Sequence, residues 1–529
     1  MIVDRLVQLV AAPAVAACAL LGVPEVPAYA EAGGCAPGMV SDFNGDGRSD
    51  TVVADPYATV GGVSQAGRVI VLYGDADARV GEGSRGIVSQ GSGSVGGSAE
   101  SGDRFGSAMA VADLDCDGFS DLVVGTPLED VGGQRDSGLV QFVWGGPASL
   151  GRARDSRQIT QNDFSGYGQR VTGSDQFGYA LDALEDVGQG GTGATSAYAV
   201  AIGVPGGNIA GRNDAGWVGV LHAFDGGPGK VAISQDTTGV PGSAETGDRF
   251  GSAVAINYFP SDRSQGDSDS DYIDVVVGVP NEDIGSTVDA GAITVVKDVY
   301  DYEFPGSLSI TQDSPGVPGV VEAGDQFGRV LDTVMVGRTA WLAVGTPNED
   351  LGRDADAGAV QLFVSSSVMI TPRASLTQDT PGVSGVSERG DRFGSQLAFA
   401  APSLGDAATR LAVAVPSEDA DVVNQGVVQV FPVADLDAES TYSQVSPGVS
   451  GAPQAGDEFG ETLAFVNGAA ERALIVGVPD DGANPAGMVD VIPLRGGAPR
   501  AWVPGAGGVP LAGSSRFGGA VAGVPGGNT

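Results

Sequence analysis

A Phe-Gly pair recurs seven times along this chain of 529 residues. In six of the seven copies, an aspartate stands two residues before the phenylalanine. The pairs begin at Phe105, Phe177, Phe250, Phe327, Phe393, Phe459 and Phe517. Such repetition indicates stacked copies of one structural unit, because a single copy cannot bury its own apolar faces. The repeat therefore overrides chain length, which alone would suggest about three or four domains.

Each repeat contains short β-branched segments separated by turn residues, and almost no helical periodicity. The segment after Phe-Gly is followed by one that ends in proline, by one that a glycine leads, and by a short closing strand. In the first complete repeat, the two middle segments are residues 123–127 and 138–144. Four strands per unit, repeated radially, predict a β-propeller. A solenoid is the alternative, but its ends would need polar capping repeats.

The two ends of the chain carry complementary parts of one unit. Residues 42–74 contain a proline-terminated strand and a glycine-led strand with no Phe-Gly before them, and residues 513–525 contain a Phe-Gly strand with little chain after it. Pairing these fragments would close a ring and remove exposed strand edges. The sequence thus predicts an all-β fold: a seven-bladed β-propeller with four-stranded blades, closed by the N- and C-terminal strands.

Two nine-residue loops carry oxygen ligands at alternate positions. The first offers the side chains of Asp42, Asn44, Asp46 and Asp50 and the carbonyl of Arg48. The second offers the side chains of Asp113, Asp115, Asp117 and Asp121 and the carbonyl of Phe119. Ca²⁺ takes six to eight oxygen ligands at about 2.3–2.6 Å, whereas Mg²⁺ prefers to keep several waters. Both loops are predicted to hold a structural Ca²⁺, and an ordinary Asp/Gly turn is the alternative.

A third candidate loop departs from this pattern. Asp274 lies six residues before Pro280, as Asp50 lies before Pro56. The acids upstream are displaced by one position, and no glycine follows the last of them; they are Asp267, Asp269 and Asp271. Calcium binding and an ordinary acidic loop both remain open for this segment.

The recurring Phe-Gly, followed by a strand that ends in Gly-x-Pro, resembles the FG-GAP repeat of integrin α-subunit propellers and of secreted actinobacterial proteins. The resemblance extends from about residue 40 to residue 525. It implies calcium hairpins on one face and ligand binding on the other. It also implies a binding or adhesion module whose partner is an extracellular protein or a cell-wall glycan. The alternative is an extracellular hydrolase of the esterase, phospholipase or glycosidase type that uses the propeller as a scaffold.

Composition limits the partners and catalytic sites that this chain can have. The formal net charge of −39 makes nucleic acid a poor partner, because phosphate binding needs clustered basic residues. His222 is the one histidine, which argues against histidine-based triads and multi-histidine metal centres. It is predicted to be an ordinary strand residue. Four Glu-Asp pairs follow strand-ending prolines, and their repetition favours a structural role over catalysis; they begin at Glu129, Glu282, Glu349 and Glu418.

The first 30 residues resemble a secretory signal. Arg5 precedes an apolar stretch over residues 6–23, and residues 28–30 offer an Ala-x-Ala cleavage site. This predicts a secreted chain whose propeller spans residues 31–529, without a transmembrane segment in the mature form. Lipidation at Cys18 is the alternative. Cleavage would leave Cys35 and Cys116, and an oxidising compartment would allow them to pair.

Overall fold

The computed structural model describes residues 41–523, apart from residues 78, 187–196, 225–226, 260–272, 300–302, 366–369, 403–407, 437–439, 468–470, 496 and 514. These residues belong to one compact unit, Ala32–Thr529. The predicted signal peptide (residues 1–30, with Cys18) lies outside the described residues, as do Cys35, Asp267, Asp269 and Asp271. Within the described part, no helix has the length and apolar character to span a bilayer.

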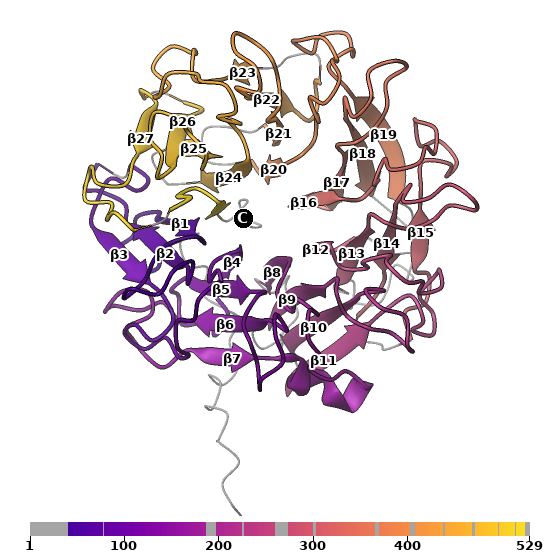
Figure 1. The fold of residues 1–529 in the computed structure, drawn as a ribbon, viewed down its shortest axis with the longest axis horizontal. Coiled ribbons are helices and arrows are strands. Elements are labelled where there is room, and N and C mark those ends of the chain that lie inside the picture. Colours follow the sequence, from indigo (N-terminus) through magenta and orange to yellow (C-terminus); the bar gives the residue numbers. More distant parts are fainter. Residues whose placement is uncertain are drawn as a thin grey trace, which may run out of the picture. The chain divides into compact units, whose positions relative to one another are not determined.

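The chain forms seven four-stranded antiparallel sheets around one axis (Figure 1), which confirms the predicted seven-bladed propeller. The strands of each blade are given from the axis outward. Blades 1 and 2 contain β28 (Ala520–Ala522), β1 (Thr51–Asp55), β2 (Arg68–Leu72) and β3 (Arg85–Val88), then β4 (Ala108–Ala112), β5 (Asp121–Thr126), β6 (Leu139–Val143) and β7 (Arg157–Ile159). Blades 3 and 4 contain β8 (Leu181–Asp186), β9 (Ala197–Val204), β10 (Trp217–Phe224) and β11 (Gly227–Ile233), then β12 (Ala253–Asn257), β13 (Asp274–Val279), β14 (Ala292–Val296) and β15 (Leu308–Ile310). Blades 5 and 6 contain β16 (Val330–Val336), β17 (Thr339–Thr346), β18 (Ala359–Ser365) and β19 (Ile370–Leu376), then β20 (Leu397–Ala400), β21 (Arg410–Val415), β22 (Val427–Pro432) and β23 (Ser440–Tyr442). Blade 7 contains β24 (Thr462–Asn467), β25 (Arg472–Val478), β26 (Met488–Pro493) and β27 (Arg500–Trp502).

The two ends of the chain complete blade 1, as predicted. Strand β28 pairs antiparallel with β1, with Val521 opposite Val53. The inner strand of each blade contacts the inner strand of the next, from β4 around to β24 and β28, and β28 contacts β4. The ring is therefore closed, because the inner strand of every blade contacts the inner strands of both neighbouring blades.

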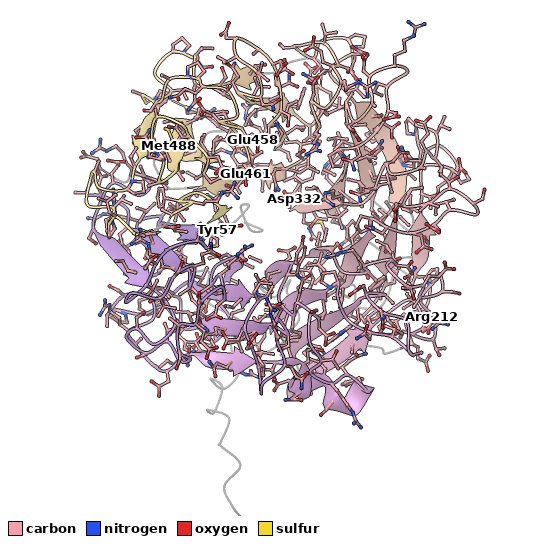
Figure 2. All side chains as sticks on the ribbon, in the orientation of Figure 1. Tyr57, Arg212, Asp332, Glu458, Glu461 and Met488 are labelled. Carbon is pink, nitrogen blue, oxygen red and sulfur yellow. The ribbon has the colours of Figure 1, made fainter. Side chains whose placement is uncertain are left out.

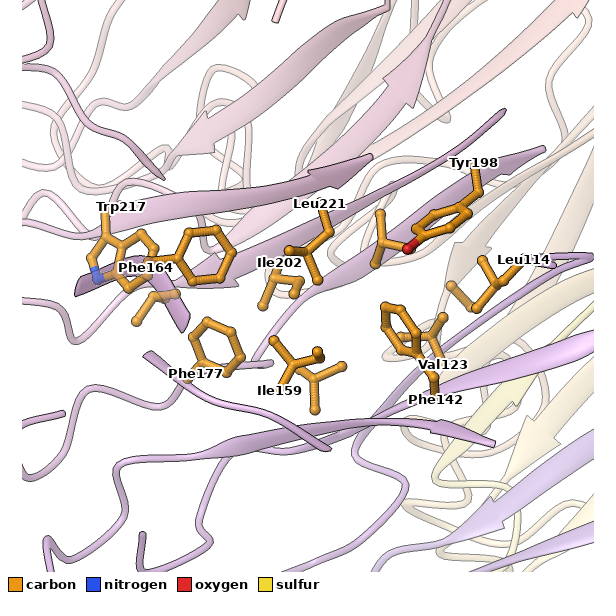
Figure 3. Close-up of a cluster of buried hydrophobic side chains, with 14 of the residues drawn as sticks. Leu114, Val123, Phe142, Ile159, Phe164, Phe177, Tyr198, Ile202, Trp217 and Leu221 are labelled. Carbon is orange, nitrogen blue, oxygen red and sulfur yellow. The ribbon is translucent and has the colours of Figure 1, made fainter. Parts of the chain in front are cut away.

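The hydrophobic core is divided into seven clusters, each shared by two neighbouring blades. Each cluster contains one phenylalanine of a Phe-Gly pair, and all seven phenylalanines are fully buried. In the cluster between blades 2 and 3 (Figure 3), Phe177 packs 6.0 Å from Trp217 and Phe164, measured between ring centroids. Phe164 comes from a 3₁₀ helix, η1 (Gln161–Tyr167), between β7 and β8. The Phe-Gly repeat is thus an inter-blade packing device, which explains why it recurs once per blade.

The antiparallel order sorts the loops onto two faces. The first and second strands of a blade are joined on one face, which carries the two predicted calcium loops, residues 42–50 and 113–121. The start of each inner strand and the proline-terminated end of the second strand lie on the opposite face. We call these the loop face and the Phe-Gly face.

Candidate metal loops

The first loop is shaped by its own side chains. The carboxylate of Asp42 accepts the backbone N–H of Gly47 at 2.8 Å, and the carbonyl oxygen of the Asn44 side chain accepts that of Asp46 at 2.9 Å. Asp46 in turn accepts the N–H of Arg48 at 3.0 Å. Gly47 has a φ of +79°, which explains the glycine at position six of the loop. The oxygen-bearing side chains therefore point into the turn that they form.

The second loop repeats these contacts position by position. Asp113 accepts the N–H of Gly118 at 2.9 Å, Asp115 that of Asp117 at 3.3 Å, and Asp117 that of Phe119 at 3.0 Å. The φ of Gly118 is +86°. The two loops thus share these contacts, with aspartate at positions one, five and nine, glycine at position six, and asparagine or aspartate at position three.

The aspartate at position nine anchors each loop to its blade. Asp50 is fully buried and accepts the N–H of Phe43 at 2.9 Å and that of Gly74 at 2.8 Å. Asp121 accepts the equivalent two bonds, at 2.9 Å and 2.8 Å. A carboxylate has about four lone-pair sites, so two backbone bonds leave room for an ion. Sequence reasoning predicted that these aspartates are ligands and did not predict that they anchor the loops.

The second loop fits a calcium ion. Carboxylate oxygens of Asp113, Asp115 and Asp117 lie within 4.8 Å of one another, and this group does not include Asp121. Two oxygens bound to one Ca²⁺ at about 2.3–2.6 Å are at most about 5 Å apart. The three carboxylates are therefore close enough to share one ion, and oxygen donors of this kind are the ligands that Ca²⁺ prefers.

The electrostatics of both loops favour a cation. Burial raises the pKa of Asp50 to about 7, and the charges of Asp42 and Asp46 add to this effect against the backbone N–H bonds that lower it. Burial and the charge of Asp115 raise the pKa of Asp121 well above its usual range. A dication would offset both the desolvation and the repulsion between these carboxylates.

The two loops contact each other across the interface of blades 1 and 2. The backbone N–H of Ser120 donates to the carbonyl of Asp42 at 2.9 Å, and the N–H of Asp42 donates to the Ser120 hydroxyl at 3.1 Å. The N–H of Gly146 donates to the carbonyl of Phe43 at 3.0 Å. The geometry of one loop therefore constrains the other. Cys116, at position four of the second loop, is disulfide-bonded.

Asp274 of the third candidate loop already has a fixed counter-ion. The Lys297 ammonium lies 2.8 Å from one oxygen of this buried carboxylate, and the Asp298 N–H donates to the other oxygen at 2.8 Å. In blades 1 and 2, a backbone N–H of the loop occupies the place of this lysine. Sequence reasoning missed Lys297, although it is one of two lysines in the chain and lies six residues after the strand-leading Gly291.

An arginine also reaches the second loop. Arg154 forms an ion pair with Asp115, and its guanidinium lies 3.7 Å from the centroid of the Trp144 ring. The sequence contained no signal for this contact, because the segment around Arg154 is not part of the repeat. Arg154 partly neutralises the loop and would share Asp115 with a bound ion.

The repeated Glu-Asp pairs serve the scaffold. Each glutamate accepts a hydrogen bond from a glutamine at the end of the preceding blade; the pairs are Gln90–Glu129, Gln235–Glu282, Gln312–Glu349 and Gln378–Glu418. Each following aspartate accepts a backbone N–H five or six residues later. One geometry in four blades supports the predicted structural role. Burial raises the pKa of Glu129, Glu282 and Glu349 to about 7, so the pKa alone does not mark a catalytic acid here.

His222 is a strand residue, as predicted. It lies within β10 and is 7% exposed. Burial lowers its pKa to about 4, so its imidazole is neutral at pH 7.

Comparison with known proteins agrees with this architecture. Residues 105–143 match the FG-GAP repeat family. A segment of 120 residues, 23% of this chain, is 37% identical to phosphatidylinositol-glycan-specific phospholipase D of Rattus norvegicus and covers 14% of that protein. A segment of 87 residues, 16% of this chain, is 38% identical to integrin alpha-2 of Bos taurus and covers 6% of it. The chain thus aligns with a small part of each relative.

Among solved structures, an alpha-L-arabinofuranosidase from Fusarium graminearum in complex with an iminosugar inhibitor superposes with a TM-score of 0.39. The superposition covers 73% of this chain and 92% of that chain, at 8% identity. This similarity is too low to support an argument about function. Taken together, the blade geometry shows a seven-bladed β-propeller, and the matched segments show that it contains an FG-GAP repeat and is similar to integrin alpha-2 over 87 residues.

Proposed function

We propose that this chain is a secreted, calcium-stabilised binding module that engages an extracellular protein or a glycan. The observation that carries the calcium part is the set of side-chain contacts shared by the loops at residues 42–50 and 113–121, together with the carboxylate group of Asp113, Asp115 and Asp117. The ions are structural, because they would hold the hairpins on the loop face and leave the Phe-Gly face free for a partner. Two occupied loops suffice for this proposal, since Lys297 already neutralises Asp274.

The proposed location rests on the N-terminal segment. A signal peptide over residues 1–30 would leave residues 31–529 as the mature propeller, with lipidation at Cys18 as the alternative. The disulfide at Cys116 supports an oxidising compartment, because disulfides persist there and are rare in the cytosol.

No observation favours the hydrolase alternative. The relative named as a phospholipase is aligned over 14% of its length, so its activity does not transfer with that segment. The repeated carboxylates of this chain are engaged in the scaffold. Binding without catalysis is therefore the better-supported function.

Thermal unfolding of residues 31–529 with excess EDTA and with CaCl₂ tests the calcium proposal. Calcium should raise the melting temperature, because each site contributes about 2.7 kcal/mol when the free ion is at about 100 times its dissociation constant. The double variant Asp46→Ala/Asp117→Ala should lose this rise. The control Asp77→Ala/Asp313→Ala removes two exposed carboxylates elsewhere and should keep it. An equal response of both double variants, or no response of the wild type, would reject calcium.

A further inference from the structure

The residue directly before each Phe-Gly phenylalanine occupies the same place in every blade, at the start of the inner strand on the Phe-Gly face. The seven residues are Arg104, Gln176, Arg249, Gln326, Arg392, Glu458 and Arg516. The first six have φ between +53° and +59°, and each donates its backbone N–H to a carbonyl of the preceding blade. The bond from Arg104 to Gln65 is 3.1 Å long, and that from Arg249 to Asp214 is 3.0 Å. The seven side chains therefore form a ring, one per blade.

This ring is basic in an acidic protein. Four of its seven residues are arginine, although 27 basic residues in 529 would place about 0.4 in seven positions (7 × 27/529). The backbone does not explain the arginines, because a left-handed φ favours glycine, asparagine and aspartate. The guanidinium group is therefore the property that four of these seven positions share.

Part of the ring neutralises itself. Arg516 pairs with Glu461 at 2.9 Å and with Asp480, and these two acids form one cluster with Glu458. Figure 2 shows Tyr57, Glu458 and Glu461 around the central axis. In this sector Arg516 is already paired with acids, so an anionic ligand would have to displace an existing ion pair.

Among the described residues, the ring arginines of blades 2 and 4 lack such ion pairs. Within the described ranges, no carboxylate lies within ion-pair distance of Arg104 or Arg249. The Arg104 guanidinium lies 4.4 Å from the centroid of the Tyr57 ring, and its buried Nε has no hydrogen-bond acceptor among the described atoms. Arg249 makes one long contact, 3.5 Å, with the side-chain oxygen of Gln176. In blade 3, which lies between the blades of these two arginines, Tyr179 is 41% exposed.

These groups fit a particular ligand chemistry. A guanidinium matches a carboxylate in a two-point geometry, and a charge-assisted bond of this kind is stronger than a neutral one. Tyrosine and arginine are also enriched among the few residues that carry most of the binding energy at protein interfaces. We propose that Arg104, Tyr179 and Arg249, here called the arginine arc, bind an acidic segment of a protein partner. The inference rests on the proposed binding function and names the chemistry of its ligand.

The net charge of −39 does not prevent this contact. At about 0.15 M salt the Debye length is about 8 Å, so repulsion from distant carboxylates is largely screened. Binding therefore depends mainly on the guanidinium groups that the ligand touches directly.

Fluorescence anisotropy with a labelled hexa-aspartate peptide tests the arc, with residues 31–529 in calcium and 0.15 M salt. The wild type should bind hexa-aspartate at least tenfold more tightly than hexa-asparagine. The variant Arg104→Gln/Arg249→Gln should lose at least tenfold in affinity. The matched control Arg353→Gln/Arg389→Gln removes two exposed arginines from other loops of the same face, and should bind as the wild type does.

Each other outcome overturns the proposal. Absence of wild-type binding, unchanged binding by the Arg104/Arg249 variant, or equal losses in both variants would remove the arc as the site. Binding of oligogalacturonate but not of hexa-aspartate, with the same dependence on Arg104 and Arg249, would assign the arc to a glycan instead. Melting curves with and without calcium, measured on the same samples, separate the calcium proposal from the arc proposal. If calcium still raises the melting temperature but the arc variants bind as the wild type does, the arc proposal alone is rejected.

Discussion

At the scale of single residues, the clearest device is the glutamine–glutamate contact between blades. Glu349 is 5% exposed and accepts a hydrogen bond from Gln312 of the preceding blade. Burial raises its pKa to about 7, with the charges of Asp325 and Glu322 adding to the effect. The folded state therefore binds a proton at this site more tightly than the unfolded chain does. This contribution to stability is full below the unfolded pKa, about 4.3, and is lost as the pH rises through about 7.

The variant Glu349→Gln tests this account. Glutamine keeps an acceptor for Gln312 but cannot ionise, so the variant should lose less stability than the wild type between pH 5 and pH 8. The difference between the two proteins should be on the order of 1–3 kcal/mol, since one pKa unit corresponds to about 1.4 kcal/mol. Urea unfolding at both pH values measures it. The exposed Glu303→Gln is the control, and an equal pH dependence in wild type and Glu349→Gln would contradict the account.

At the scale of the strand, the glycine that leads the third strand of each blade permits contact with the next blade. Gly216 precedes β10 and forms a bridge with Phe250, the Phe-Gly phenylalanine of the next blade. A Cβ at Gly216 would lie 2.2 Å from the backbone oxygen of Phe250 and 2.5 Å from its nitrogen. Because these are backbone atoms, the blades would have to move apart. The glycine that leads the third strand of one blade thus contacts the Phe-Gly phenylalanine of the next blade directly, through their backbones.

Alanine at this position should separate the blades. We expect Gly216→Ala to destabilise the propeller by more than about 2 kcal/mol, through the clash and the left-handed φ of +80°. Gly211→Ala is the matched control: its φ is +86°, but its Cβ would meet nothing within 4 Å. The Gly211→Ala control should lower the free energy of unfolding by about 1 kcal/mol, the cost of a left-handed φ alone. Thermal or urea unfolding compares the two, and equal losses would show that φ, and not the contact with Phe250, determines the effect.

At the scale of the whole molecule, the ring depends on the contact between its two ends. Asp55, at the end of β1, is fully buried and lies where the C-terminal segment meets blade 1. It accepts bonds from the Ser515 hydroxyl at 2.7 Å, from the Arg516 N–H at 2.9 Å and from the Arg68 guanidinium at 3.2 Å. Arg68 in turn donates to the carbonyl of Pro510 at 2.6 Å. One buried carboxylate therefore connects segments about 460 residues apart.

Removal of this carboxylate should open the ring. Asp55→Ala leaves Arg68 buried without its partner, which typically costs about 3–5 kcal/mol. Hydrogen exchange should rise more in residues 517–522 than in β13, in a blade away from the closure. Arg79→Ala, which breaks the exposed pair with Asp75, should cost about 0–1 kcal/mol and leave the exchange unchanged. If hydrogen exchange in Asp55→Ala rises equally in all blades, the contact between the two ends of the chain does not open before the rest of the ring.

The repeat predicted the number of blades, their four strands and the pairing of the two ends. It did so because every blade must bury the same faces against its neighbours, and the residues that allow this, such as Phe177 and Gly216, recur at fixed places. The two candidate metal loops could also be predicted from the sequence, because oxygen-bearing side chains at alternate positions around a glycine form a local pattern that requires no knowledge of the fold. Local sequence was sufficient wherever a residue acts through its own turn or strand.

Tertiary structure decided the contacts between blades. Asp182 and Asp332 stand five residues after their Phe-Gly phenylalanines, where the other five blades have alanine. Only the fold shows that Asp182 accepts the N–H of Ile256, and Asp332 that of Phe399, on the inner strand of the next blade. The counter-ion role of Lys297 and the arginine arc were hidden for the same reason. The sequence by itself determined which strands and loops form, because these depend on short-range pattern; the ring determined which charges meet, because it brings together residues that are dozens to hundreds of positions apart.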